Sequence, residues 1–258
     1  MRYHLDTIPV WDALKKNTEC MFCTLRAQAE ERAVEKFLGE SVMEPDTRIR
    51  VNAQGFCGRH QAALYAGGHR LGHALMLHTH LLEEQKRLTK ALAALRQQAG
   101  DLAASGLTEI PTGKHRQKRE KLLQSAAALR QQAQSCVICD TVAESMGHWL
   151  HTFFHLYKTD AEFRRVLADG KGFCLPDLGL LIETAAKELH GKALAEFVEL
   201  LTERTAINLQ RIEGDLAWLI RKYDYRFDAE PWHNSRDAVE RTANKLNGRC
   251  IGSEQKEG

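Results

Sequence analysis

Six of the seven cysteines of this chain fall into two groups that share one spacing. Each group has a CxxC pair and, 34 or 35 positions further on, the cysteine of a Gly-Phe-Cys triplet. Cysteines at such spacings in a chain expected to lie in the cytoplasm are more often metal ligands than disulfide partners. The pattern predicts a duplicated module with a period near 116 residues and metal chemistry in each copy. The groups are Cys20, Cys23 and Cys57, and Cys136, Cys139 and Cys174.

In the first group the third cysteine begins a CxxH motif that ends at His60. Residues three apart share one face of a helix, so both members of a pair can reach one ion. Two such pairs supply the four sulfur and nitrogen ligands of tetrahedral zinc, and a helix N-terminus favours the thiolate. We predict a closed zinc site made by Cys20, Cys23, Cys57 and His60, which joins two helix starts and leaves no position open for catalysis. The alternative is a set of buried thiols without metal.

In the second group Asp177 stands where the first group has its histidine. We predict a second site made by Cys136, Cys139, Cys174 and Asp177, although oxygen is a less common fourth ligand of structural zinc. The alternatives are a weaker site, a site completed by water or another histidine, and a copy that has lost its metal. Because thiolates also hold iron–sulfur clusters, such a cluster is an alternative cofactor for either group.

Two helix faces rich in histidine lie close to these motifs in the sequence. If the faces met, they would form a further metal or proton-transfer site. The alternative is that these side chains are solvated or hydrogen-bonded in the interior. The two faces are His148, His151 and His155, and His69, His73 and His80.

The elements that must position the cysteines are helices, and we expect an all-α fold. Each copy reads as helix, short helix, Gly-Phe-Cys turn, helix, glycine break and long helix. Apolar residues spaced by three and four on both sides of a turn at 105–113 predict an antiparallel helical hairpin that joins the two cysteine-rich modules. We expect Ser235 to cap the last helix, Gly248 to end it, and Cys250 to lie in a loose tail. The predicted segments are a first module over 1–71, the hairpin over 72–134, a second module with its long helix over 135–222, and a C-terminal strap, short helix and tail over 223–258.

Composition narrows the possible functions. A net charge of +2 argues against a surface that is basic throughout, and a mean hydropathy of −0.41 without a long apolar run predicts no membrane span. The first residues lack the pattern of a signal peptide, so we expect a cytoplasmic protein. A basic run over 114–121 is a candidate contact for nucleic acid or an acidic partner, but it lacks interleaved aromatic residues. The nucleotide-binding loops, nucleophile elbow and HExxH motif of common enzyme classes are missing.

The doubled CxxC…GFCxxH pattern and the C-terminal tail together resemble an uncharacterised bacterial family. The tail carries Lys222–Phe227, Pro231-Trp232, Arg236–Val239 and Lys245–Gly248. The family is a domain of unknown function whose members often bear the label of an ABC-transporter substrate-binding protein. The resemblance covers nearly the whole chain and implies no established activity. Asp177 departs from the family's pattern, and the missing export signal fits the transporter label poorly.

These observations predict a cytoplasmic metal-binding protein, with zinc as the cofactor and a structural or adaptor role. An unknown protein partner fits that role. One alternative is an iron–sulfur, metal-handling or catalytic protein that uses the second site and the nearby histidines. The other is a nucleic-acid-binding protein that uses the basic run over 114–121.

Overall fold

The computed structural model describes residues 3–16, 18–104 and 113–252. These residues form helices without a strand, which confirms the all-α fold. The predicted turn at 105–113 lies, except for Gly113, outside the described residues. The helices are α1 (Tyr3–Lys15), α2 (Met21–Leu38), η1 (Glu40–Met43), α3 (Pro45–Gln54), α4 (Gly58–Ala66), α5 (Arg70–Ala103), α6 (Gly113–Gln132), α7 (Val137–Thr159), α8 (Ala161–Asp169), α9 (Leu175–Glu188), α10 (Gly191–Arg221), η2 (Tyr225–Phe227) and α11 (Ala238–Asn247).

The chain divides into two compact units. Unit 1 comprises Met1–Glu30 with Val142–Gly258, and unit 2 comprises Glu31–Thr141. Two helices belong to both units: α2 begins in unit 1 and ends in unit 2, and α7 begins in unit 2 and ends in unit 1. Each unit therefore contains one CxxC pair and the Gly-Phe-Cys triplet of the other sequence group. The division into four consecutive segments stays a prediction.

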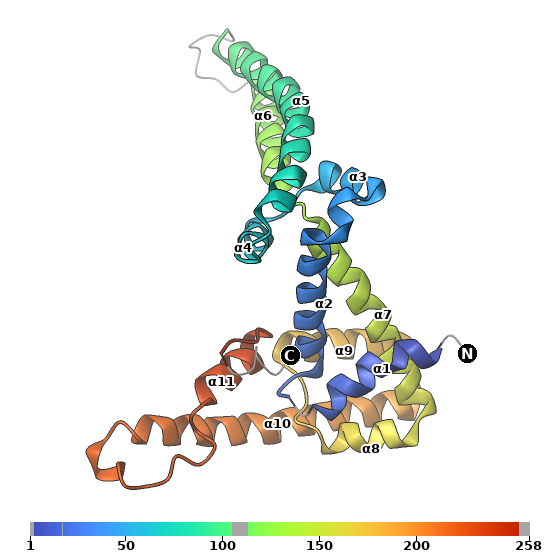
Figure 1. Ribbon diagram of the computed structural model, residues 1–258, viewed down its shortest axis with the longest axis vertical. Helices are drawn as coiled ribbons and strands as arrows, with labels where there is room; N and C mark the ends of the chain where they lie inside the picture. The colour runs from blue at the N-terminus through green and yellow to red at the C-terminus, as the bar shows by residue number, and fades with distance from the viewer. Residues whose placement is uncertain (1–2, 17, 105–112, 253–258) are drawn as a thin grey trace. The chain divides into compact units, whose positions relative to one another are not determined.

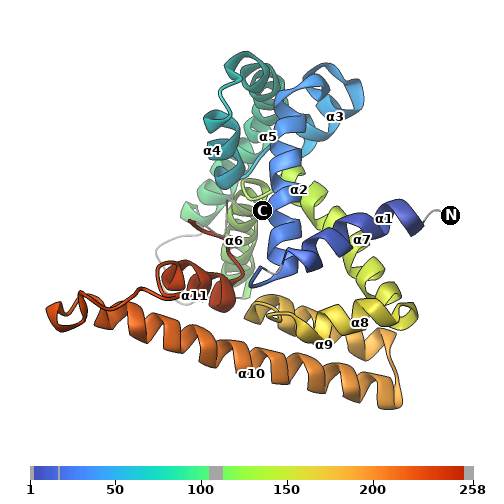
Figure 2. The same cartoon turned by 60° about the horizontal axis from the view of Figure 1, so that its bottom comes forward.

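Unit 1 is organised around a core of aromatic side chains. Phe153 on α7 lies at its centre, with ring centroids 5.5 Å from Phe22, 5.3 Å from Phe163 and 6.0 Å from Phe173. Phe22 stands inside the first CxxC motif and Phe173 inside the second Gly-Phe-Cys triplet, so burial of these rings holds both motifs against the core. The long helix α10 carries α9 and α11 along its length (Figure 2).

Unit 2 contains a compact part around α3 and α4 and the predicted helical hairpin. Helices α5 and α6 run side by side (Figure 1), with side-chain hydrogen bonds from Gln98 to Ser125 (3.1 Å) and from Gln132 to Glu84 (3.2 Å). At about 1.5 Å per residue, α5 is about 50 Å long. Most of the hairpin is exposed, since α6 has no buried residue among those described.

Local sequence signals set most helix ends. Pro45 occupies the first turn of α3, and the side chain of Asp160 caps α8 by accepting from the backbone amides of the next turn. Gly248 ends α11 in the left-handed conformation, as expected. The cap predicted at Ser235 is wrong: the N-cap of α11 is Asp237, and the Ser235 hydroxyl donates to the Trp232 carbonyl. Among the described helices, none combines the length and apolarity needed to span a lipid bilayer.

Candidate metal centres

All eight predicted ligands lie at the N-termini of four helices. Cys57 and Cys174 are the N-caps of α4 and α9, and Cys20 and Cys136 directly precede α2 and α7. The second ligand of each pair follows three residues later, in the first helical turn. The unpaired amides and the positive end of the dipole at a helix start stabilise thiolates, which are the ligating form of cysteine. The sequence thus places every ligand where the backbone favours its charged form.

One set of ligand atoms, here called the aspartate cluster, lies in unit 1 and belongs to Cys20, Cys23, Cys174 and Asp177. Cys174 Sγ is 3.7 Å from Cys20 Sγ and 3.5 Å from Cys23 Sγ. Oδ2 of Asp177 lies 3.1–3.5 Å from all three sulfurs. The backbone amides of Cys23 and Asp177 each donate to the cysteine that precedes their helix, at 3.4 Å. All four residues are buried, so these donor atoms converge on one enclosed point.

Arg26 holds the carboxylate of the aspartate cluster in place. One guanidinium nitrogen donates to Asp177 Oδ1 at 2.5 Å, and the other lies 3.3 Å from Oδ2 and 3.9 Å from Cys23 Sγ. Arg26 follows Cys23 by one helical turn on α2, so its position follows from the helix that presents the cysteines. Three thiolates, one carboxylate and a divalent ion would carry a net charge of about −2, which this guanidinium partly balances.

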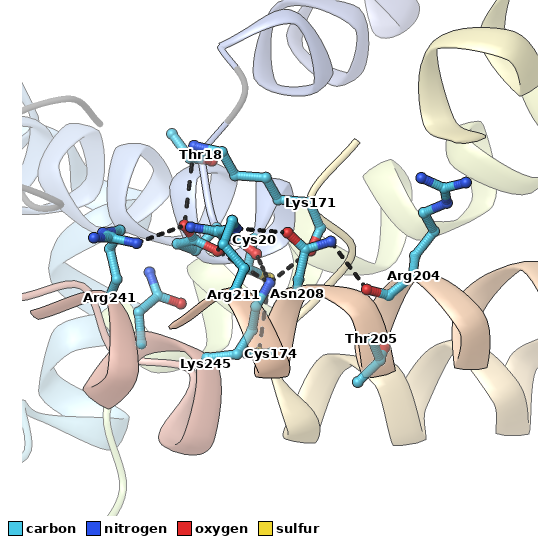
Figure 3. Close-up of polar contacts among 12 residues, drawn as sticks. Thr18, Cys20, Lys171, Cys174, Arg204, Thr205, Asn208, Arg211, Arg241 and Lys245 are labelled. Atoms are coloured by element: carbon cyan, nitrogen blue, oxygen red, sulfur yellow. Dashed lines mark hydrogen bonds and ion pairs between the residues drawn. The ribbon is translucent and has the colours of Figure 1, made fainter. Parts of the chain in front are cut away.

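A buried network of charged residues adjoins the same cluster. Glu19 is fully buried, and Arg211 donates to both of its carboxylate oxygens at 2.7 Å. Lys245, also fully buried, donates from Nζ to the backbone carbonyls of Glu19 (2.6 Å) and Lys171 (2.7 Å). Figure 3 shows Arg211 and Lys245 of this network near Cys20 and Cys174. Lys245 Nζ also lies 3.3 Å from Glu19, and Arg211 lies 3.8 Å from Asp215, so the buried charges beside the cluster are paired with one another.

The other set of ligand atoms, here called the histidine cluster, lies in unit 2 and belongs to Cys57, His60, Cys136 and Cys139. Nδ1 of His60 is 3.1 Å from Cys136 Sγ and 3.4 Å from the sulfurs of both Cys57 and Cys139. The sulfurs of Cys57 and Cys139 are 3.8 Å apart. His60 is fully buried, while Cys57 and Cys139 are half-buried. Three sulfurs and one ring nitrogen therefore face a common centre.

The Gly-Phe-Cys turn of the histidine cluster is held by backbone and ring contacts. Gly55 has a φ of 65°, and a Cβ atom there would overlap the ring of His80. The carbonyl of Gly55 accepts from the amide of Val137 at 3.1 Å, which joins this turn to the start of α7. Phe56 packs edge-on against Phe37, with ring centroids 5.8 Å apart. These contacts bring Cys57 next to the distant pair on α7.

The thiol groups of each cluster crowd one another enough to separate their pKa values. Burial raises the pKa of Cys136, but hydrogen bonds with His60 and with backbone amides bring it down to about 6. Burial and the charge of Cys136 raise the pKa of Cys139 to about 12. In the aspartate cluster, burial and the charge of Cys20 raise the pKa of Asp177. Thiol and carboxyl groups this close to one another cannot all lose their protons, because their negative charges would repel. A bound cation offsets that repulsion and allows every ligand to be deprotonated.

The spacing of the donor atoms fits a single tetrahedral ion. Bonds of about 2.3 Å to sulfur and 2.0–2.2 Å to nitrogen or oxygen imply edges of about 3.4–3.8 Å between ligands. The sulfur–sulfur distances of 3.5–3.8 Å match these edges and far exceed the roughly 2.05 Å of a disulfide. The shortest distances from His60 nitrogen and Asp177 oxygen to sulfur are 3.1 Å, slightly below these edges. Both clusters could hold a metal ion.

Comparison with known proteins gives a family without an activity. The family model DUF6062, described as a family of unknown function, matches residues 1–253. The chain belongs to this family. No curated protein and no solved structure matches the chain. The chemistry of this DUF6062 protein must therefore be inferred from its own residues.

The predicted grouping of ligands within each sequence group is wrong. In this DUF6062 protein, Cys20 and Cys23 meet Cys174 and Asp177, while Cys57 and His60 meet Cys136 and Cys139. The two groups exchange partners because α2 and α7 each start in the unit that holds the other group's Gly-Phe-Cys turn. Spacing within a helix shows which residues share a face, but it does not show which distant helix starts lie together.

The two histidine-rich helix faces and the basic run over 114–121 lie outside both clusters. Neither histidine face contributes to a group of three or more ligands among the described residues. His73 instead bonds Gln61 through Nε2 (2.8 Å), and His80 bonds the Asn52 carbonyl through Nδ1 (3.1 Å). In the basic run on α6, Lys118 donates to the Asp101 carbonyl of the partner helix at 2.9 Å.

Sequence reasoning missed Arg26 and the Glu19 network. The one available signal for Arg26 was its position three residues after Cys23, on the same helix face. The sequence placed Cys250 in a loose tail, whereas its side chain packs against the core of unit 1 and accepts a hydrogen bond from Asn244 Nδ2 at 3.3 Å.

Proposed function

We propose that this protein is a cytoplasmic scaffold whose two units are each held together by one zinc ion. The observation that carries the proposal is the convergence, twice, of four metal-ligating atoms within 4.8 Å of one another. Each set comes from two helix starts that are far apart in the chain: 76 positions separate His60 from Cys136, and 151 separate Cys23 from Cys174. An ion bound at each of these two points would hold the two helix starts together and add its binding free energy to the stability of the fold.

The donor distances favour one ion in each cluster over an iron–sulfur cluster. In a cluster with two or four irons the four ligands are divided among different iron atoms, so some of them stand further apart than around one ion, whereas the four ligand atoms of each group here all lie within 4.8 Å of one another. Sulfurs 3.5–3.8 Å apart suit a mononuclear centre. Zinc accepts three thiolates completed by an imidazole or a carboxylate, has no redox requirement and prefers the tetrahedral arrangement that these distances describe.

Burial supports a structural role over catalysis at the aspartate cluster. Its four ligands have at most 2% of their surface exposed, and Asp177 occupies the fourth position. A catalytic zinc needs a position that water or substrate can reach. The closed donor set is what a structural ion requires.

An adaptor role is supported by the surface of the hairpin. Helices α5 and α6 expose several large apolar side chains along a two-helix arm that buries little of itself. Exposed apolar residues on an extended arm are typical of a surface that contacts another protein. The exposed leucines of the arm are Leu71, Leu75, Leu81, Leu82, Leu88, Leu92 and Leu123.

Metal identity and stoichiometry after anaerobic purification without added metal test the proposal. We expect two zinc ions per chain by elemental analysis and a colourless protein. Protein without zinc or iron would contradict the metal assignment, and a brown protein absorbing near 400 nm would replace zinc with an iron–sulfur cluster. Steeply salt-dependent binding to nucleic acid, lost on neutralising the basic residues of α6, would favour the nucleic-acid alternative instead.

A further inference from the structure

The seventh cysteine lies next to the aspartate cluster. Gly248, the left-handed residue that ends α11, passes directly over the cluster: a Cβ atom there would lie 3.0 Å from Cys174 Sγ and 3.8 Å from Cys23 Sγ. Two residues later, Cys250 packs against the same core and accepts from the Asn244 amide. Side-chain hydrogen bonding with Cys174 and Cys20, and then with Cys250, raises the pKa of Cys23. A fifth metal-ligating side chain therefore borders a site that already has four.

Cys250 differs from the buried cysteines of the cluster in its access to solvent. It is half-buried and belongs to the segment that follows α11, whereas Cys20 and Cys174 are fully buried on helix starts. Because Cys250 lies outside a helix, its backbone can shift without breaking helical hydrogen bonds. Cys250 is thus the sulfur best placed to approach or leave an ion at this site.

Asp177 is the ligand that the site can best release. Its oxygen is a poorer donor to zinc than a thiolate, because zinc is a borderline-soft ion. The carboxylate also has another partner, since Arg26 pairs with both of its oxygens. A carboxylate that leaves the ion therefore remains paired while buried, which removes the main penalty for its release.

We propose that Cys250 is an exchange ligand of the aspartate cluster, able to replace the Asp177 carboxylate on the bound ion. The exchange forms one metal–sulfur bond as one metal–oxygen bond breaks. The Cys250 thiol gives its proton to water, the carboxylate stays with Arg26, and no atom is oxidised or reduced. The result is a site with four thiolate ligands, of which Cys250 is half-buried and the other three are buried. This inference rests on the proposed metal binding.

Cobalt substitution tests the exchange, because each cobalt–thiolate bond adds to the sulfur-to-metal charge-transfer absorption. Wild type should bind two cobalt ions through six thiolates, three in each cluster. In Asp177→Ala, Cys250 should become the seventh, raising this absorption by about one-sixth. Asp177→Ala/Cys250→Ser should show no increase. Cys250→Ser alone should have the charge-transfer absorption of wild type. His60→Ala should show no increase in this absorption, because all three cysteines of unit 2 are already ligands.

Two outcomes separate failure of this inference from failure of the proposed function. If wild type binds fewer than two cobalt ions, or binds them without thiolate absorption, the proposed function itself is wrong. If wild type behaves as expected but Asp177→Ala has the same absorption as the double variant, Cys250 is not an exchange ligand. Should Asp177→Ala fail to fold by circular dichroism, Asp177→Asn keeps the side-chain volume. Cys250 of cobalt-loaded Asp177→Asn should then resist alkylation that it undergoes in wild type, and equal alkylation would overturn the inference.

Discussion

Replacing Cys136 by serine removes one ligand of the histidine cluster with almost no change in side-chain volume. Cys136 is buried and lies 3.1 Å from His60 Nδ1, so the substitution acts at the point where α7 meets α4. We expect the variant to lose one of two bound ions. The helix starts at 57–60 and 136–139 would then no longer be tied together.

The size of the effect follows from how tightly the ion binds folded protein. An ion that binds only the folded state stabilises it by about 4.1 kcal/mol when the free metal concentration is about 1,000 times the dissociation constant. Domains are typically stable by only about 5–15 kcal/mol, so the loss is a large share of the total. At roughly 2–4 °C per kcal/mol, the melting temperature should fall by roughly 8–16 °C under that metal concentration.

Thermal melting followed by circular dichroism, with metal analysis of the same samples, measures both parts of this prediction. Cys250→Ser is the matched control for the metal count, because it removes a cysteine that is not a ligand of either cluster, and it should keep two ions. The reasoning is refuted if Cys136→Ser keeps two ions. It is also refuted if the variant loses an ion while its melting temperature stays that of wild type.

Three further predictions concern the surroundings of the ligands. Arg26→Ala should weaken metal binding at the aspartate cluster by about 10–100-fold in competition with a chromophoric chelator, and equal affinity would show that the guanidinium is not needed. In metal-free protein, ultraviolet absorbance should show one thiolate forming as the pH rises through about 6. Burial raises the pKa of Cys136, but hydrogen bonds with His60 and with backbone amides together lower that pKa by more. A Cys136→Ser variant should lack this step. Gly248→Ala should speed metal loss to a chelator, because its left-handed backbone and nearby sulfurs exclude a Cβ atom, whereas Gly147→Ala, with open space around it, should not.

The identity of the eight candidate ligands could be predicted because it depends on local geometry. Ligands three apart at the start of a helix share a face, and helix starts are marked in the sequence by glycine and by the cysteines themselves. The hairpin was also predictable, since its apolar spacing is a property of α5 and α6 alone. These features require no knowledge of which helices pack together.

The partners of each pair could not be predicted, because they depend on packing between distant segments. The duplicated spacing suggests that each group closes on itself, whereas burial of Phe22 and Phe173 in one core brings Cys23 to Cys174 instead. The same holds for Arg26, whose partner Asp177 lies 151 positions away. Charge pairs of that kind leave no periodic trace in a single sequence.

Metal counts in two double variants test most directly how the ligands are paired. In Cys23→Ser/Cys174→Ser both substitutions fall in the aspartate cluster, so the protein should keep one ion. In Cys23→Ser/Cys57→Ser one substitution falls in each cluster, so both ions should be lost. The reverse result, with both ions lost from the first variant and one kept by the second, would contradict the account and restore a separate site within each sequence group.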